Sequence, residues 1–305
     1  MLKEAIDKIK NKFDIGEPPF EYRVLITLPE KEYPKYLAKM FYKNTGEKLN
    51  LKHPKTFNEK IQWLKLYDAT RLKTKLTDKV RVRDWVKEKI GEEYLKPVLQ
   101  ICDTFKQIDF EKLPQSFIIK VNHACKWHFK IKDKMKLLMH PELGEYLNAK
   151  FNYWLGLSFY PFGGMEMQYK DILPKLIVEP VLIDEDKTYP MEYEIYCFNG
   201  EPKIFQKIEY KQPTVCYVYD EHFQDYDIKF NPGYIKESMP AEDNLKKAVE
   251  LSKILAKDFK LVRVDWLIYN NQIYFNEMTF SPFSGFCIFQ NPEWNERLGK
   301  MLKLD

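Results

Sequence analysis

The chain has 305 residues, of which 31% are charged and 45% hydrophobic, a composition that indicates a globular protein and excludes a disordered one. Its formal net charge of +4 is too small, and its lysines are too dispersed, for a nucleic-acid-binding protein. Five cysteines without CxxC spacing predict reduced thiols and a cytoplasmic location. The longest uncharged stretch, residues 151–165, is too short to cross a bilayer.

The chain begins with apolar residues at helical spacing among lysines, over residues 1–13. The charges near its start argue against a signal peptide. A helix of this kind either packs on its own domain or binds a membrane surface as a peripheral anchor. We expect the first arrangement, and association with the inner face of the membrane is the alternative.

Residues 30–115 have a mainly helical pattern. Thr56 opens a capping-box sequence before an amphipathic run, which predicts a helix start. Thr77 and Asp78 predict the start of another helix, and Gly91 predicts its end.

From about residue 117 the sequence changes to short apolar runs separated by turns, a pattern typical of strands. These runs cover residues 116–121, 129–131, 176–182, 193–198, 204–210 and 215–219. Two longer periodic segments, residues 142–157 and 241–259, predict helices. The pattern therefore predicts an α+β fold, with a helical N-terminal region joined to a sheet-rich region.

Lys120 lies within an otherwise apolar strand. A buried ammonium group needs an anion, and a nucleotide phosphate would serve; a lysine at the solvent end of the strand is the alternative. The following loop, residues 123–128, is in a position to cover phosphates. Its His123, Cys125 and His128 lack a second ligand pair, which argues against zinc.

A second apolar strand, residues 176–182, contains Glu179 and is followed by Asp184 and Asp186. An adenine ring needs an apolar slot with exposed backbone groups, and a ribose needs a carboxylate. This segment can supply both.

Two strand-like runs near the C-terminus, residues 261–269 and 272–280, flank the turn signal Asn270-Asn271 and predict a hairpin. Asp265 and Glu277 lie in these runs among apolar neighbours, where a charge is costly unless a cation neutralises it. This pattern favours a divalent metal site over an ordinary surface pair.

Arg263 has the same strand parity as Asp265, so both side chains point to one face, and the arginine can bind an anion beside the metal. The small-residue loop 281–286 follows the second strand and can bring backbone N–H groups close to a ligand. Metal, carboxylates and an arginine together indicate phosphate chemistry.

The order of these features resembles the ATP-grasp ligases, in particular the TupA-like family, which is related to a teichuronopeptide biosynthesis protein. The most specific similarities are residues 56–60, the Cys197-Phe198-Asn199-Gly200 segment and residues 277–282, and the resemblance covers residues 50–305. It implies a nucleotide held between two sheet-containing subdomains. We expect a mainly helical N-terminal region at 1–115, a central nucleotide-lid subdomain at 116–182 and a C-terminal catalytic subdomain at 183–305.

The resemblance also implies roles for individual residues. In the nucleotide site, the ATP phosphates would be contacted by Lys120 and Lys126, the adenine by Glu179, Val181 and Leu182, and the ribose by Asp184 or Asp186. Magnesium would be bound by Asp265, Glu277 and Thr279, and the charge that develops at the acyl centre would be stabilised by Arg263. The substrate would be bound by Ser281, Ser284 and Gly285.

Three positions depart from the family pattern. Thr279 stands where an asparagine metal ligand is common, so coordination there is expected to be weaker or filled by water. The loop after Lys120 lacks glycine, and Lys126 or His123 would compensate. Glu194 stands where many relatives have a basic residue.

The activity implied is an ATP- and Mg²⁺-dependent ligation of a carboxylate to an amine through an acyl phosphate. The expected carboxylate is a uronic acid of a bacterial surface polysaccharide of capsule, O-antigen or teichuronopeptide type, and the expected amine is an amino acid or small amine. The alternatives are a metal-dependent glycosyltransferase using Asp225 and Asp227, which we expect in a solvated loop, and a non-catalytic glycan-binding protein.

Overall fold

The computed structural model describes residues 18–182, 190–231 and 233–305. The N-terminal segment 1–13 and the ribose candidates Asp184 and Asp186 therefore lie outside the described residues. Within that part of the chain, no helix is long and apolar enough to cross a membrane.

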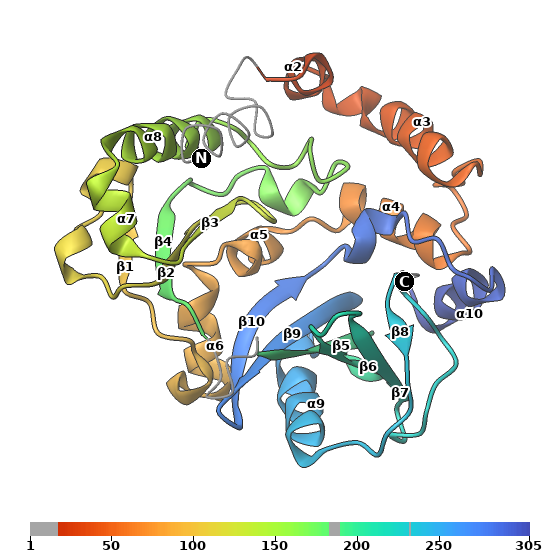
Figure 1. Ribbon diagram of the computed structural model, residues 1–305. Coiled ribbons are helices and arrows are strands. Elements are labelled where there is room, and N and C mark those ends of the chain that lie inside the picture. Colours follow the sequence, from red (N-terminus) through yellow and green to blue (C-terminus); the bar gives the residue numbers. More distant parts are fainter. Residues whose placement is uncertain (1–17, 183–189, 232) are drawn as a thin grey trace.

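Among the described residues, the α-helices α2 to α6 follow one another before residue 100, and all the strands come after these helices, with further helices between some of them (Figure 1). The α-helices are α2 (Phe20–Ile26), α3 (Tyr33–Thr45), α4 (Phe57–Tyr67), α5 (Arg71–Thr77), α6 (Val82–Ile90), α7 (Lys134–Met139), α8 (Pro141–Leu155), α9 (Asp243–Ala256) and α10 (Glu293–Met301). The strands are β1 (Gln100–Cys102), β2 (Phe117–Val121), β3 (His128–Ile131), β4 (Leu176–Pro180), β5 (Met191–Phe198), β6 (Glu201–Glu209), β7 (Val215–Asp220), β8 (Ile235–Lys236), β9 (Leu261–Tyr269) and β10 (Gln272–Thr279). Short 3₁₀ helices are η1 (Glu30–Glu32), η2 (Glu92–Tyr94), η3 (Phe105–Gln107), η4 (Phe110–Lys112), η5 (Met167–Tyr169) and η6 (Pro282–Gly285).

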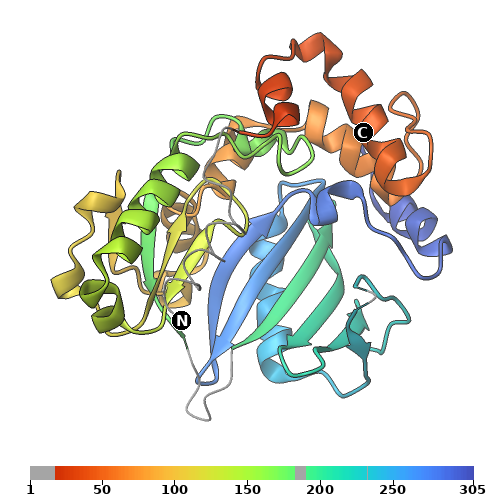
Figure 2. The same cartoon turned by 45° about the horizontal axis from the view of Figure 1, so that its top comes forward.

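The strands form two separate sheets. The smaller has the antiparallel order β1-β4-β2-β3, and the larger has the order β10-β9-β5-β6-β7-β8, in which only the β7–β8 pair is parallel. Figures 1 and 2 show the small sheet, with α7 and α8 on its outer side, facing the β10 edge of the large sheet. The predicted α+β arrangement is confirmed. The small sheet includes β1, a strand within the region predicted to be mainly helical.

Each sheet has one face buried against helices. On the large sheet, Ile195, Val264 and Trp266 pack against α9, as the period-2 pattern of these strands requires. On the small sheet, Phe117 and Ile119 belong to one apolar cluster with residues of α8. The charged residues on the opposite parity of β5, β9 and β10 therefore point away from α9.

The C-terminal hairpin is confirmed. Strands β9 and β10 pair antiparallel around Asn270 and Asn271, which both have positive φ (47° and 58°), as a two-residue hairpin turn requires. The register shifts between Phe275 and Glu277, so Asn276 is an extra residue in a bulge. Beyond it, Glu277 lies directly opposite Asp265.

The capping box at α4 is also confirmed, with Thr56 accepting a hydrogen bond from the Glu59 backbone N–H. The predicted helix start at Thr77-Asp78 is wrong: α5 ends at Thr77 and α6 begins at Val82, although Gly91 ends α6 as expected. The side chain of Asp78 accepts hydrogen bonds from the Val80 backbone N–H and from Asn122, and its backbone carbonyl oxygen accepts one from the Val82 N–H, so Asp78 holds the turn that leads into α6.

Helix α4 attaches the C-terminal segment to the rest of the protein. Its Lys60 donates to the carbonyl oxygens of Gly299 and Leu302, at the end of α10. Gly299 is buried against the chain just before α4, and a Cβ atom there would lie 2.2 Å from the carbonyl oxygen of Lys55. The close packing of α4 and α10 therefore depends on a glycine.

We predict that Gly299→Ala lowers the free energy of unfolding by about 1–3 kcal/mol, because the added methyl group forces α10 away from α4. Urea unfolding measures this change. The control is Gly144→Ala in α8, where a Cβ would have no neighbour within 4 Å; it should raise stability by about 0.5–1 kcal/mol. Equal stability of the two variants would contradict the packing argument.

Candidate active site

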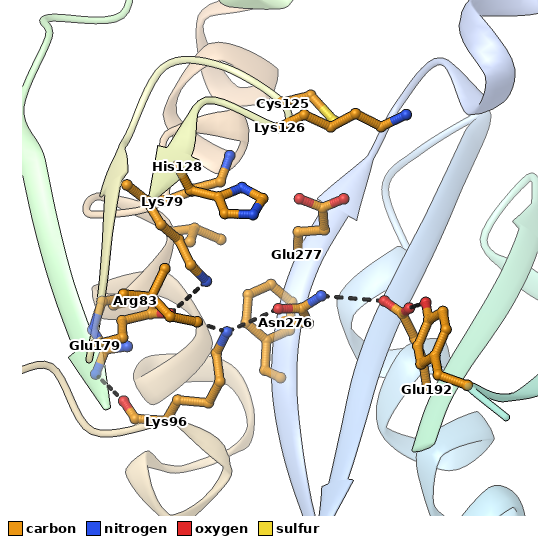
Figure 3. A pocket seen from close by; sticks show the side chains of 15 residues that line it. Lys79, Arg83, Lys96, Cys125, Lys126, His128, Glu179, Glu192, Asn276 and Glu277 are labelled. Carbon is orange, nitrogen blue, oxygen red and sulfur yellow. Dashed lines mark hydrogen bonds and ion pairs between the residues drawn. The ribbon is translucent and has the colours of Figure 1, made fainter. Parts of the chain in front are cut away.

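A cavity of about 400 Å³ lies between the two sheets (Figure 3). It is lined by Lys79, Val82, Arg83, Lys96, Ile118, Lys120, Cys125, Lys126, His128, Glu179, Glu192, Tyr210, Phe275, Asn276 and Glu277. The helical region and the small sheet contribute most of the cations, and the large sheet contributes Glu192 and Glu277. The predicted residues Lys120, Lys126, Glu179 and Glu277 are thus brought together.

Two lysines share the carboxylate of Glu179. The Nζ atom of Lys120 lies 2.6 Å from Glu179 Oε2, and that of Lys96 lies 3.5 Å from the same oxygen. Burial alone would raise the pKa of Glu179, but Lys96 and Lys120 hold it at about 2. Burial, with Lys120 beside it, lowers the pKa of Lys96 to about 8. Positive charge therefore exceeds negative charge at this end of the cavity.

Lys96 connects the two sides of the cavity. Its Nζ donates to Asn276 Oδ1 at 2.8 Å, and the amide of Asn276 donates to Glu192 at 3.3 Å (Figure 3). Tyr210 donates a further hydrogen bond to Glu192. Asn276, the bulged residue of β10, is thus fixed between the helical region and the large sheet.

Glu277 points into the cavity toward cations from the opposite side (Figure 3). Among the described residues it has no ion pair within 4 Å, and its one hydrogen bond comes from Thr279 Oγ1 at 3.4 Å. Burial would raise the pKa of Glu277, but the positive charges of Lys79, Arg263 and Lys120 lower it. Glu277 is therefore an ionised carboxylate with oxygen atoms available to a cation.

Arg263 and Asp265 form a bidentate ion pair. Nε and Nη2 of Arg263 lie 2.7 and 2.6 Å from the two oxygens of Asp265, which is fully buried. Arg263 Nη1 also lies 3.1 Å from Glu194. In the sheet, Glu194, Asp265 and Glu277 are direct neighbours on β5, β9 and β10, so three carboxylates share one face. The unexpected Glu194 contributes a second acidic partner for Arg263.

The loop after β2 is rigid without glycine. Asn122 donates to Asp78 and Leu173 and accepts from the Lys175 backbone, while Lys79 donates to the Ala124 carbonyl oxygen at 2.7 Å. Lys126 adopts a positive φ of 62° and lines the cavity. His123, the other predicted compensating residue, is buried against the Trp154 and Leu157 carbonyl oxygens and does not line this cavity.

A second, more apolar cavity of about 570 Å³ adjoins the first and shares Lys96, Ile118, Lys120, Glu179 and Tyr210 with it. It is further lined by Lys130, Pro180, Val181, Leu182, Pro190, Lys211, Gln212, Thr214 and Leu267. The predicted Val181 and Leu182 thus border an apolar slot next to Glu179. The shared residues join the two cavities into one continuous cleft, of which only the first part is lined by β10.

The predicted substrate residues lie beyond the end of β10. Ser281 donates to Glu166 Oε1 at 2.5 Å, and the Ser284 and Gly285 carbonyl oxygens accept hydrogen bonds from Gln62 of α4. None of the three lines the two cavities described above. The sequence analysis missed Lys79, Arg83, Lys96, Glu192 and Glu166 as members of this region, because each is a single charged residue outside any recognisable motif.

Asp225 and Asp227, the residues of the glycosyltransferase alternative, do not line either cavity of the cleft. Asp225 forms an ion pair with Lys236, with its oxygens 2.8 and 2.9 Å from Nζ. Asp227 lines a separate cavity beside Trp294. Across the part of the chain that is described, no group of three or more His, Cys, Asp or Glu side chains is arranged to hold a metal.

The structure is similar in fold to several solved ligases. D-alanine–D-alanine ligase from Bacillus anthracis in complex with ATP has 14% identity and a TM-score of 0.39, over 68% of this chain and 54% of that one. The D-alanine–D-alanine ligase from Helicobacter pylori has 14% identity and a TM-score of 0.39, over 75% of this chain and 61% of that one. ATP-grasp ligase PsnB complexed with minimal precursor, Mg and ADP has 10% identity and a TM-score of 0.39, over 70% of this chain and 53% of that one. The chain thus spans just over half the length of these proteins.

No curated protein sequence matches the chain. The family model of the TupA-like ATP-grasp proteins matches residues 59–303, which is most of the chain and includes the cleft and the C-terminal hairpin. The chain therefore belongs to the TupA-like ATP-grasp family, and its two facing sheets form an ATP-grasp fold.

Proposed function

We propose that this protein is an ATP- and Mg²⁺-dependent ligase that joins a carboxylate to an amine through an acyl phosphate. The observation that carries this proposal is the cleft itself, in which Lys96 and Lys120 face the ionised Glu277 beside an apolar slot. The cations suit the phosphates of a nucleotide, and the slot bordered by Val181 and Leu182 suits its adenine.

Glu179 has a different role in this proposal from the one expected at first. Its carboxylate accepts from Lys120 and is shared with Lys96, so it holds both ammonium groups at the cleft. ATP phosphates would bind on the free side of these lysines, where Lys79, Arg83 and Lys126 add positive charge. Glu179 then positions the phosphate-binding lysines, whether or not it also contacts the adenine amino group.

A magnesium ion fits the residues present. Mg²⁺ prefers oxygen ligands and is commonly held by one or two carboxylates together with phosphates and water. Glu277 has no ion pair among the described residues, and Asp265, its direct neighbour across the hairpin, would hold the ion with the lone pairs that Arg263 leaves unused. Burial raises the pKa of Asp265, an effect that Arg263 opposes and that a bound cation would oppose further. Thr279 lies next to Glu277 through a hydrogen bond and stays a candidate for a weak contact. The ion would supply charge neutralisation at the terminal phosphate.

The chemistry we propose follows from this arrangement. The substrate carboxylate attacks the terminal phosphorus of ATP, ADP leaves, and an amine then displaces phosphate from the acyl phosphate. Arg263 is held by Asp265 and Glu194 on the cleft face of the sheet, so its guanidinium group has a fixed position there. A metal ion bound by the carboxylates would leave more of its charge for the acyl oxyanion. Fixed charge of this kind stabilises an oxyanion without reorganisation during the reaction.

For the substrate we propose a uronic acid of a bacterial surface polysaccharide as the carboxylate, and an amino acid or small amine as the acceptor. The support for the glycan is the membership of the TupA-like family. A screen of phosphate release with ATP, Mg²⁺, uronic acids and a panel of amines tests the proposal. Release that requires both a uronic acid and an amine, with one ADP per amide, is the expected result. Transfer of a sugar from a nucleotide sugar with ATP unchanged would contradict it.

The carboxylates of the hairpin provide the first test of the site. Asp265→Asn and Glu277→Gln should each lower turnover by at least about a hundredfold, because charge stabilisation of phosphoryl transfer is lost. The double change Asp225→Ala with Asp227→Ala should leave turnover within about threefold of the unaltered protein. Near-normal turnover in both hairpin variants would show that the metal does not bind there.

We predict that Lys120→Met weakens binding of a non-hydrolysable ATP analogue by about ten- to a hundredfold, because a cation facing the phosphates is lost while the apolar stem stays. Titration calorimetry measures the affinity. The control is Lys132→Met, an exposed lysine after β3. If Lys120→Met binds the analogue normally, Lys120 serves only as the partner of Glu179.

The pKa of Lys96 predicts how nucleotide affinity depends on pH. With a pKa of about 8, Lys96 is charged at pH 7 and loses its proton as the pH rises. Attraction to phosphate falls with that charge, so the Kd of the ATP analogue should rise by about tenfold between pH 7 and pH 9. Lys96→Met should bind more weakly at pH 7 and lack this rise. A pH dependence that persists in the variant would assign it to another group.

A further inference from the structure

A carboxylate that no part of the nucleotide site requires lies just beyond the end of β10. Glu166 immediately precedes η5, in the connection between α8 and β4, and this connection lies beside α4 and α5 (Figure 1). Its Oε1 accepts a hydrogen bond of 2.5 Å from Ser281 Oγ, which itself accepts one of 2.8 Å from Gln168. Glu166 is thereby fixed against the segment that follows Glu277.

The strand geometry places this carboxylate on the same side of the sheet as the catalytic charges. Met278 and Phe280 are buried in the core on the α9 side. By the alternation of a strand, Glu277, Thr279 and Ser281 point to the opposite face, which is the face of the cleft. Glu166, bound to Ser281, therefore lies at the end of the row that contains Glu277.

The charge of Glu166 acts on groups of the cleft. Glu166 and Glu277 act on each other, and both act on Cys125 in the loop over the cleft. The pKa of Tyr169 is raised mainly by burial and then by the negative charges of Glu166 and Glu277, while the positive charge of Arg263 lowers it. Tyr169 is therefore within electrostatic range of both Glu166 and the hairpin.

Glu166 lacks a cationic partner within the described residues. Its Oε2 has no hydrogen bond or ion pair there, and it lies against Gly163, where a Cβ atom would come within 2.2 Å. The nearest cation, Lys65, directs its protons to the Gly164 and Ser284 carbonyl oxygens and to Ser284 Oγ. Glu166 is half-buried, and Lys65 opposes only part of the effect of burial on its carboxylate, so this position suits a positively charged ligand.

The order of groups along the cleft indicates which ligand this is. The apolar slot comes first, then the lysines around Glu179, and then Glu277. Glu166 lines neither cavity and lies beyond the end of β10, where it is hydrogen-bonded to Ser281. A nucleotide lying in this direction would present its terminal phosphate, and the acyl phosphate formed from it, toward Glu166. The remaining reactant in the proposed function is an amine, which is an ammonium cation in neutral solution.

We propose that Glu166 binds the ammonium group of the acceptor and takes a proton from it before the amine attacks the acyl phosphate. This inference rests on the proposed function. Burial, opposed by Ser281 and Lys65, raises the pKa of Glu166 to about 7, which suits a group that receives a proton at neutral pH. Ser281, which is hydrogen-bonded to Glu166, would help to fix the amine beside the acyl carbon.

The step balances as follows. The ammonium R–NH₃⁺ gives one proton to Glu166 and becomes R–NH₂. Its nitrogen lone pair forms the bond to the acyl carbon, and the bond from that carbon to the phosphate oxygen breaks, with the electron pair leaving on phosphate. The nitrogen loses a second proton to the departing phosphate, the amide keeps the third, and Glu166 releases its proton to water.

The test compares an amine that needs a base with one that does not. Hydroxylamine is largely unprotonated at neutral pH, so it traps an acyl phosphate as a hydroxamate without a base. With the uronic acid and amine selected by the phosphate-release screen, Glu166→Gln should lower amide formation by about a hundredfold or more and leave hydroxamate formation within about threefold. The control is Glu142→Gln, an exposed carboxylate at the start of α8, which should alter neither reaction.

Each outcome of this experiment decides the inference. Equal loss of both products in Glu166→Gln would overturn it, since Glu166 would then serve the fold or the phosphoryl transfer, and retention of both would overturn it as well. If the unaltered protein forms neither product from any pair, the proposed function fails and this inference fails with it.

Ser281→Ala keeps the Glu166 carboxylate and provides a second variant. It should raise the KM for the amine without changing hydroxamate formation. An equal effect on both products would count against the proposal.

Discussion

The structure depends on balancing charges that are buried between two sheets. Lys96 and Lys120 have little exposed surface and depend on Glu179 for compensation, yet one carboxylate balances only part of the positive charge around it. An ion pair in such a place contributes little net stability, while removing one partner leaves an expensive unpaired charge. The surplus of cations therefore suits a bound anion and adds little to the stability of the fold. Glu277 on the opposite wall suits a cation for the same reason, and the two charges together suit the metal–phosphate complex that we propose.

The second requirement is that the end of the cleft stays in place, and α4 provides this. Asn58, Gln62 and Lys65 recur at helical spacing on one face of α4 and donate to the Cys287, Gly285 and Ser284 carbonyl oxygens. In this segment Phe283 and Ser284 both adopt positive φ, a conformation that persists only when surrounding contacts hold it. The buried polar face of α4 supplies those contacts, so a helix far from β10 in sequence fixes the geometry just beyond Glu277.

The sequence predicted the parts of the fold and site that depend on local periodicity. A turn of two asparagines between alternating strands determines the hairpin, and strand parity alone placed Arg263 and Asp265 on one face. Contacts between distant strands are not encoded in that way. Nothing local indicates that β5 pairs with β9 so that Glu194 lies beside Asp265, or that Lys96, before the three-residue strand β1, reaches Asn276 across the cleft. Glu166 is part of an irregular connection with no period, so only the folded structure reveals its position.

Regular strands and irregular connections have different roles in the function that we propose. Strands hold Lys120, Glu179, Asp265 and Glu277, whose geometry must be constant because every ATP molecule presents the same phosphates. The groups beyond Glu277 lie in the connection before β4 and in the loop after β10, where side chains can change without disturbing either sheet. Changes in these irregular segments would therefore alter the acceptor while leaving phosphoryl transfer intact. In the function that we propose, acceptor specificity would thus be determined around Glu166 and Ser281, and the hairpin would determine the phosphoryl chemistry.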